Sequence, residues 1–406
     1  MKPDIHDPSF ARREIPPRAP SPGAAPAGKR LFSIIVARDE EGLRPWLAQW
    51  EGLAADAIEP NVFYEPWMLL PAMRHLAAGV QLRTLLVLAS DPFNPSREPE
   101  LCGVVPLQCR RIAWVGMTVF RLWKYSHCFL CTPLLRQGCA AECLSALLDW
   151  FATDREGGAI VQFNHVAGEG PFQQALVDCL FERQSLHLVT DLHNRALLRC
   201  APDADAYLHA ALSGEGRRAQ ARRLRRLGEA GRVEFAQLAP SDDVREWVAQ
   251  FLELEAAGWK GKLGTALASA DSDRNFIEDV VAAAFARGRL LAVAMRLDGR
   301  PIAQRIAFTA GPGSFSFKTA FAEEFSKHSP GALLEIENIR RAHAVPQIHW
   351  MDSCTKPDNA LINRLWMHRR TIQSVAVATG KAPGGLVVSA IPLLRGLKRL
   401  ASRLSS

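Results

Sequence analysis

Residues 296–337 read RLDGRPIAQRIAFTAGPGSFSFKTAFAEEFSKHSPGALLEIE and carry the clearest fold signal in the chain. Two strand-like runs meet at the Asp298–Gly299 turn, a third follows the turn at 311–313, and a Ser-Pro-Gly loop then opens a helix. The first turn of a helix leaves unpaired N–H groups and a partial positive charge, so a small-residue loop there forms a natural phosphate cradle. This order of elements is typical of an acyltransferase core and leaves the substrate open.

The chain has 406 residues, of which 48% are hydrophobic and 22% charged, so it can bury the cores of two ordinary domains. Its formal net charge is +7, and arginine far outnumbers lysine. Guanidinium groups pair bidentately with phosphate and carboxylate, which favours an anionic ligand such as CoA or a nucleic acid. A GC-rich genome would enrich arginine in the same way.

The sequence also bears on location and metal content. No apolar run reaches the ~18 residues that a membrane span needs, and the N-terminus lacks an apolar signal core, so we expect a cytoplasmic protein. Nine cysteines, an odd number in a long chain, favour reduced thiols. Cys128 and Cys131 lie in a predicted strand, and Cys139 and Cys143 on a predicted helix, so we expect no zinc site.

Four parts follow one another along the chain. Residues 1–30 hold seven prolines among small and charged residues and are predicted to be disordered. Residues 31–198 and 199–380 each alternate strands and helices, which predicts two α/β lobes of similar design and an internal duplication. Residues 381–406 are predicted to form a basic amphipathic tail. Packing on its own lobe is favoured for this tail over contact with a membrane surface.

Hydrophobic periodicity and turn residues predict the elements of both lobes. The first lobe has predicted strands at 31–36, 82–89, 101–112 and 160–163, and helices at 67–77, 139–153 and 172–183. The second has the three strands of the opening segment, further strands at 196–200, 232–238, 348–352 and 371–378, and helices at 204–230, 242–257, 276–287, 332–342 and 359–367.

Short motifs follow one another between residues 60 and 370. They are NVFYEPWM at 61–68, TPLLRQG at 132–138, GEGPF at 168–172, AAGWKG at 256–261, GRPIA at 299–303, FKTAF at 317–321, SPGALLE at 329–335, and DSC, PDN and RLW within 352–366. In this order they resemble the CelD-like acyltransferases, a branch of the GNAT superfamily associated with cellulose and exopolysaccharide production. In outline they are also similar to the Fem-type peptidoglycan aminoacyltransferases, which carry two GNAT-like halves.

The resemblance implies a tandem GNAT-like fold that moves an acyl group from acyl-CoA, such as acetyl-CoA, to an amine or hydroxyl acceptor. It also implies a link to exopolysaccharide or cell-envelope biosynthesis. The pyrophosphate loop of GNAT enzymes usually reads Q/R-x-x-G-x-G/A, and here Lys327, Pro330 and Ala332 occupy the three defined positions. Pro330 has no N–H to donate, so Lys327, Ser329, Gly331 and Ala332 are the predicted donor-binding residues.

Acyl transfer needs a polarised carbonyl, a base for the acceptor and a leaving thiolate. Ala322 stands where relatives commonly carry an acid, so the base would come from Glu323 or Glu324, and Glu324 is our candidate. Solvated loop acids are the alternative interpretation. Lys318 lies in the third strand, where alternation predicts that it shares a face with Ser316. It is the candidate contact to the anionic donor, with a strand-edge charge as the alternative.

Three further residues are predicted to serve the acceptor. Trp259 and Lys260 follow a helix end in a Gly-rich loop, a usual place for binding residues, although an exposed helix cap has the same pattern. Asp352 ends a predicted strand, where the site residues of α/β folds gather, and is predicted to bind the acceptor and take part in catalysis. Cys354 is better explained as a buried inert thiol than as a nucleophile.

The strongest charge cluster lies in the predicted helix 204–230 and comprises Arg217, Arg218, Arg222, Arg223, Arg225 and Arg226. At helical spacing Arg218, Arg222, Arg225 and Arg226 share one face, which suits CoA phosphates, tRNA or an anionic polymer. A solvated helix face is the alternative. Two rival functions therefore stay open. One is an aminoacyl-tRNA-dependent cell-wall transferase, and the other is a catalytically silent GNAT scaffold in polysaccharide synthesis, which the altered loop favours.

Overall fold

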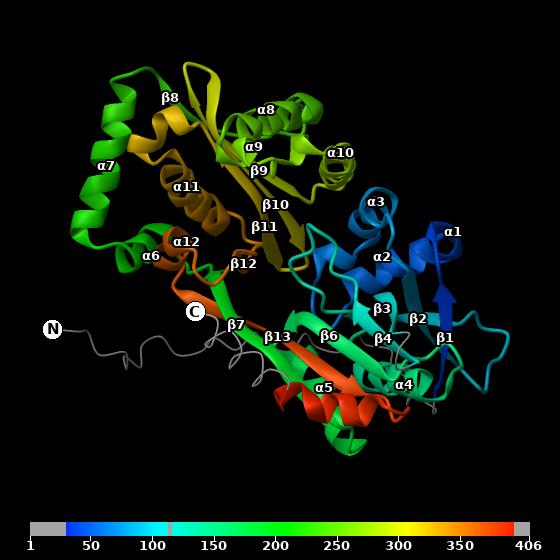
Figure 1. Cartoon of the computed structure of the whole chain (residues 1–406). Coiled ribbons are helices and arrows are strands. Elements are labelled where there is room, and N and C mark those ends of the chain that lie inside the picture. Colours follow the sequence, from blue (N-terminus) through cyan, green and yellow to red (C-terminus); the bar gives the residue numbers. More distant parts are fainter. Residues whose placement is uncertain (1–29, 113–115, 394–406) are drawn as a thin grey trace.

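One mixed sheet runs through the whole molecule and carries helices on both faces (Figure 1). The computed structural model describes residues 30–112 and 116–393. Its strand order is β1-β2-β3-β4-β6-β13-β7-β12-β11-β10-β9-β8, with β5 paired to β3. The predicted α/β class is confirmed. The predicted disordered segment lies outside the described residues except for Arg30, and so does the predicted tail from residue 394 onward.

The first half contains the elements that precede residue 187. Its strands are β1 (Leu31–Ala37), β2 (Leu82–Ser90), β3 (Glu100–Ile112), β4 (Met117–Leu122), β5 (Leu134–Leu135) and β6 (Ile160–Ala167). Its helices are α1 (Glu40–Leu43), α2 (Leu47–Ala55), α3 (Pro66–Leu76), α4 (Ala140–Thr153) and α5 (Pro171–Glu182), with short 3-10 turns η2 (Arg44–Trp46) and η3 (Val62–Tyr64). Most of the predicted elements of this half are found within a few residues of their predicted ends.

The second half begins with β7 (His187–Arg199), which starts well before the predicted strand at 196–200. Its other strands are β8 (Val233–Gln237), β9 (Leu290–Leu297), β10 (Arg300–Ala310), β11 (Gly313–Phe321), β12 (Trp350–Asp352) and β13 (His368–Ala378). Its helices are α6 (Ala204–Ala211), α7 (Gly214–Gly228), α8 (Val244–Ala257), α9 (Trp259–Lys262), α10 (Asp271–Ala286), α11 (Pro330–Ala344) and α12 (Ala360–Leu365), with 3-10 turns η5 (Leu267–Ser269) and η6 (Glu323–His328).

The two halves repeat one pattern of strand pairing. In the first half β1, β2, β3 and β4 pair antiparallel in turn, and β4 then pairs parallel with β6. In the second half β8, β9, β10 and β11 pair antiparallel in turn, and β11 then pairs parallel with β12. This repetition is what the sequence analysis expected of two units of similar design.

The last strand of each half crosses to the other half. β7 pairs with β12, β13 pairs with β6, and β7 and β13 pair antiparallel with each other. The predicted second lobe at 199–380 therefore includes a strand, β13, that completes the sheet of the first half. The largest buried cluster likewise contains residues of both halves, such as Phe63 and Phe276, because the exchange holds the two sheets together.

Two segments of the second half differ from their predicted form. The predicted helix at 204–230 is two helices, because Leu212 is extended and the Ser213 hydroxyl accepts the Gly216 N–H to start α7. The predicted loop after Gly258 is the short helix α9. A side chain at Gly261 would meet the Ala256 carbonyl at 1.7 Å, so the close return of the chain requires glycine there. No described helix has the length and apolar character to cross a membrane.

A buried ion pair joins β10 to α11. Arg305 Nη1 lies 2.5 Å from Glu335 Oε2, and the other carboxylate oxygen accepts from Asn338 and from the Trp366 indole. Arg305 and Glu335 are both buried. Breaking such a pair leaves one uncompensated charge in the core, which is costly even where the intact pair adds little.

We expect E335Q to lower the free energy of unfolding by about 3–5 kcal/mol, measured by urea denaturation, because Arg305 loses its counter-charge. R300A on the same strand is the matched control, since Arg300 pairs with Glu324 at 3.0 Å on the exposed surface. It should cost less than about 1 kcal/mol. Equal losses in the two variants would contradict the assigned role of the buried pair.

Candidate functional site

The β11 and β12 strands form a fork in the second half. They pair in parallel over Gly313–Phe315 and Trp350–Asp352, after which β12 ends and β11 runs on to Phe321. A parallel pair that separates leaves backbone N–H and C=O groups of the longer strand without a strand partner on that side. The fork therefore offers an edge to which an extended ligand can hydrogen-bond.

The matching fork of the first half is filled by its own chain. Pairing of β4 with β6 ends near Arg121, and the segment 124–135 then enters the gap. The Cys131 N–H donates to the His165 carbonyl at 2.9 Å, and the Asn61 amide donates to the carbonyls of Leu130 and Thr132 at 3.1 and 2.8 Å. These bonds close the first fork, which makes the fork of the second half the candidate site.

A β-bulge turns Lys318 toward the first half. In the pairing of β10 with β11, Ala307 faces Ser316 and Ile306 faces Lys318, so Phe317 is the extra residue. Opposed residues share a face and consecutive residues do not, which places Ser316 and Lys318 on opposite faces. The prediction that they share a face is wrong. Alternation holds only where the strand is regular, and the bulge shifts it by one residue.

The Lys318 ammonium lies among aromatic rings from both halves. Nζ is 5.8 Å from the centre of the Phe129 ring, which belongs to the segment that fills the first fork, and 5.6 Å from that of Phe317. Ring faces attract a cation at this range. Burial lowers the pKa of Lys318, and the nearby charge of Lys260 lowers it further. The site thus holds a desolvated cation at the junction of the halves.

Two predicted acceptor residues lie on α9, which follows α8. Lys260 Nζ is 2.5 Å from Glu255 Oε1, and the other oxygen of this buried carboxylate accepts the Leu267 N–H at 2.8 Å. The helix therefore brings Lys260 close enough to Lys318 for the two charges to interact. Trp259 is 52% exposed and presents its ring to solvent.

Asp352 lies at the base of the fork, where β12 ends, as its sequence position suggested. Its Oδ2 accepts from Arg195 at 2.6 Å and from Arg370 at 3.0 Å, and its Oδ1 accepts the Cys354 N–H at 2.9 Å. Burial raises the pKa of Asp352, but Arg195 and Arg370 outweigh this effect and hold the pKa below its ordinary value. Both oxygens are engaged by the protein, and burial raises the pKa of the Cys354 thiol well above its usual range.

The predicted base Glu324 lies on the surface, away from the rings around Lys318. It belongs to η6 and pairs with Arg300 at 3.0 Å, while Glu323 pairs with Lys262 at 2.5 Å. Lys327, in the same turn, is exposed. The 3-10 turn thus directs the two acids and the lysine toward solvent.

The predicted phosphate loop leads directly into α11. Ser329 adopts the left-handed conformation with φ 51°, and its carbonyl accepts the Ala332 N–H at 3.0 Å. Pro330 has no N–H, so within the described residues Gly331 keeps the unpaired donor of this first turn. The predicted cradle is therefore narrower than its sequence suggested.

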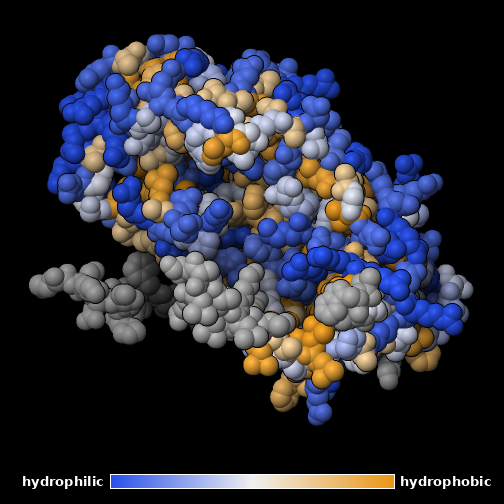
Figure 2. Space-filling view, viewed as in Figure 1, coloured by the Kyte–Doolittle hydropathy of each residue, from blue (hydrophilic) through white to orange (hydrophobic). Residues whose placement is uncertain are grey.

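The basic helix α7 packs against η6 and so lies beside this loop (Figure 1). Its buried side carries Gln220 and Leu227. Figure 2 shows a hydrophilic outer edge over this helix. The four arginines predicted to share one face are all exposed, namely Arg218, Arg222, Arg225 and Arg226.

Comparison with known proteins places these elements in a family. Residues 214–359 match the family model described as an acetyltransferase (GNAT) domain. The chain carries a GNAT domain. This stretch runs from α7 to the end of the DSC and PDN motifs and contains the β11–β12 fork, Lys318 and the loop before α11. The GNAT part of the sequence resemblance is thereby confirmed, whereas the CelD-like branch stays a prediction.

Solved structures share the fold over most of the chain at low sequence identity. FemX has 10% identity and a TM-score of 0.54, covering 82% of this chain and 96% of its own. A conserved protein of unknown function from Bacteroides thetaiotaomicron has 11% identity and a TM-score of 0.50, covering 82% and 97%. A tandem GNAT protein from the clavulanic acid biosynthesis pathway has 12% identity and a TM-score of 0.43, covering 87% and 100%. Comparison with curated proteins finds no match.

Several residues around the GNAT-domain fork were not singled out from the sequence. Phe129 was passed over because its segment was considered for its cysteines, and Glu255 because it is one of several acids on an amphipathic helix. Arg195 is an isolated cation in a strand and was a signal that could have been used. In the described part of the chain no cluster of side chains could hold a metal ion.

Asp352 should contribute stability in a pH-dependent way. Because its pKa is lowered in the folded state, the contribution is complete above the ordinary pKa of about 3.9 and is lost as pH falls through the folded-state pKa. We expect D352N to cost about 3–5 kcal/mol at pH 7 in urea denaturation, with a smaller difference from wild type at pH 3.

D205N is the matched control for this variant. Asp205 pairs with Arg340 at 3.7 Å on the exposed surface, so its replacement should cost less than about 1 kcal/mol at pH 7. A D352N penalty that stays constant between pH 7 and pH 3 would contradict the assigned charge interaction.

Proposed function

We propose that this chain is a GNAT-like acyltransferase that moves an acyl group from acyl-CoA, such as acetyl-CoA, to an amine or hydroxyl acceptor. The observation that carries the proposal is the β11–β12 fork inside the matched GNAT domain, with the buried cation of Lys318 beside the free edge of β11. An extended donor arm can pair with that edge as an added strand does. The thioester would then lie near the bulge at Phe317.

The residues of the fork can supply the charge stabilisation that acyl transfer requires. Attack on a thioester carbonyl places negative charge on its oxygen, and preorganised donors in a desolvated site stabilise that charge strongly. Lys318 is a cation in such a site and would serve the carbonyl oxygen or an anionic part of the donor. The donor phosphates would lie toward Gly331, Lys327 and the arginines of α7, where unpaired N–H groups and exposed cations lie side by side.

The acceptor would approach between the halves, past Lys260 and Trp259. We further propose, from the CelD-like resemblance, that the acceptor belongs to exopolysaccharide or cell-envelope biosynthesis. Asp352 would act at one remove, because its oxygens are engaged by two arginines and by the backbone. It would hold the base of the fork in shape for the acceptor. Glu324 would reach the acceptor only if η6 moved.

The test is calorimetric titration of the full chain with acetyl-CoA and with a longer acyl-CoA. K318A should weaken binding about 10- to 100-fold, the loss expected when a charge-assisted contact is removed. K262A is the control, since Lys262 is exposed and pairs with Glu323. It should bind as wild type does. If wild type binds neither acyl-CoA, the proposed function fails.

A second candidate is an aminoacyl-tRNA-dependent transferase, which the exposed arginine face of α7 favours. For this function R222A/R226A should weaken tRNA binding and reduce the dependence of log K on log salt by about 0.7–0.9 for each arginine removed. The same variant should leave acyl-CoA titrations almost unchanged if acyl-CoA is the donor. Filter binding at several salt concentrations separates the two cases.

A catalytically silent scaffold is the third candidate, favoured by the narrow loop before α11 and by Ala322. For a scaffold neither K318A nor R222A/R226A should change the binding of any donor.

A further inference from the structure

His127 and Asp273 form a buried pair across the junction of the halves. His127 belongs to the segment that fills the first fork, and Asp273 lies in the first turn of α10 in the second half. Nε2 of His127 is 2.9 Å from Asp273 Oδ1, and the imidazole is buried while the carboxylate side chain is 29% exposed. The pair thus leads from the rim of the junction to the rings around Lys318.

The other ring nitrogen of His127 has no partner. Nδ1 is buried and makes no hydrogen bond in the described part of the chain. When Nε2–H donates to a carboxylate, Nδ1 carries the lone pair, which is the tautomer of a base. A buried acceptor without a partner is uncommon and costs free energy, so it calls for a ligand with a proton to share.

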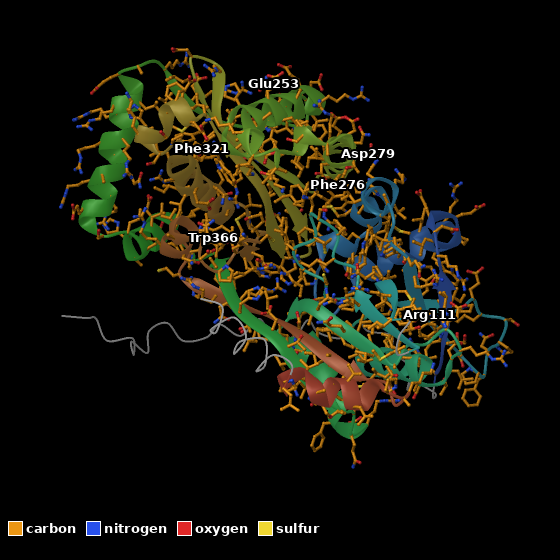
Figure 3. All side chains as sticks on the ribbon, in the orientation of Figure 1. Arg111, Glu253, Phe276, Asp279, Phe321 and Trp366 are labelled. Atoms are coloured by element: carbon orange, nitrogen blue, oxygen red, sulfur yellow. The ribbon has the colours of Figure 1, made fainter. Side chains whose placement is uncertain are left out.

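The ring is fixed in place by neighbours from the second half. It stacks on Phe276 at 5.5 Å with an interplanar angle of 22° and meets the edge of Phe317 at 5.9 Å. Figure 3 shows Phe276 on the side of α10 that faces the first half. Phe317 is the bulge residue at the fork, so the imidazole lies next to the place proposed for the thioester.

Charged groups from each adjoining element act on His127. They are Lys318 of β11, Asp273 of α10 and Glu255 of α8, with Lys260 of α9 paired to Glu255. Burial and then the charge of Lys318 lower the pKa of His127 to about 4, against the opposing effect of Asp273. The imidazole is therefore neutral near pH 7 and free to accept a proton.

A second buried polar group near Lys318 also lacks partners. Gln304 faces Ala320 across the β10–β11 pair, which makes it a diagonal neighbour of Lys318 on the same face. Its side chain is fully buried, and in the described residues neither its amide oxygen nor its amide nitrogen makes a hydrogen bond. Two unpartnered polar groups on one side of the fork indicate space that a polar ligand completes.

We propose that His127 is the acid–base residue of acyl transfer in this protein and that Asp273 positions it. The inference rests on the proposed function. The acceptor nitrogen or oxygen attacks the thioester carbonyl, so that a C–N or C–O bond forms and the C–S bond breaks. Nδ1 takes the proton that the acceptor loses and passes it to the departing thiolate, which leaves as the free thiol of CoA.

The residue that carries the chemistry of the second fork thus comes from the half whose own fork is filled. The segment 124–135 has a double role, since it closes one site and supplies a base to the other. The acceptor is then a primary amine or a hydroxyl that reaches the junction of the halves past Asp273 and Lys260.

The experiment uses the full chain with acetyl-CoA and hydroxylamine as a small nucleophilic acceptor, and measures release of the CoA thiol. H127Q keeps an N–H for Asp273 but has no ring nitrogen to accept a proton. We expect kcat to fall about 10²- to 10⁴-fold, the usual contribution of general acid–base catalysis, with an unchanged Kd for acetyl-CoA by calorimetry.

The matched control is H75Q. His75 Nε2 lies 2.8 Å from Asp279 Oδ2 on the same helix α10, but this pair is on the surface between α3 and α10. It should leave kcat and Kd unchanged. D273N provides an independent test, since it keeps a polar side chain and removes the charge that positions the imidazole. Its kcat should fall with an unchanged Kd.

The outcomes separate the inference from the proposed function. Wild-type rates in both H127Q and D273N, with acetyl-CoA still bound, would overturn the role of His127 and leave the acyltransferase proposal standing. Failure of wild type to bind acetyl-CoA would overturn the proposed function and this inference together. Loss of kcat in H127Q with an unchanged Kd, beside an unchanged H75Q, supports the assignment.

Discussion

The exchange of β7 and β13 between the halves is the interaction on which the remaining structure depends. Each strand pairs with the penultimate strand of the other half, and the two pair with each other. Without β13, β6 and β7 would both expose unpaired edges, which folded proteins avoid. The exchange therefore makes one sheet of two repeated units. It also fixes the distance between them, so that residues of one half can reach the fork of the other (Figure 1).

The two forks show how a repeated unit can be divided between structural and chemical tasks. Both halves contain a parallel strand pair that separates, and the physical problem is the same in each, because separated strands leave backbone groups unpaired. The first half meets that need with its own segment 124–135, held by Asn61 and Thr132. The second leaves the β11 edge available to a ligand. The aromatic cluster from Phe63 to Phe317 then joins filled and open forks into one core.

The bulge at Phe317 decides which groups face the open fork. A regular strand would have placed Lys318 beside Ser316 and Arg305, in the buried network with Glu335. One extra residue turns it to the opposite face, toward His127, Phe129 and α8 to α10. Bulges redirect single side chains in this way without disturbing the flanking pairs. The electrostatics of the site therefore depend on a local irregularity of one strand.

The amino-acid sequence by itself determined the α/β class, most elements, the GNAT character and the arginine face of α7, because these follow from local periodicity, turn residues and short motifs. It also marked Lys318 and Asp352 as positions of interest. Only the tertiary structure decided the strand exchange, the filled first fork, the face of Lys318 and the pairing of His127 with Asp273. Each of these joins residues far apart in the chain, and hydrophobic patterning carries no record of which distant residues meet. The ion pairs that engage Asp352 and Glu324 are of the same kind, since they depend on packing between elements.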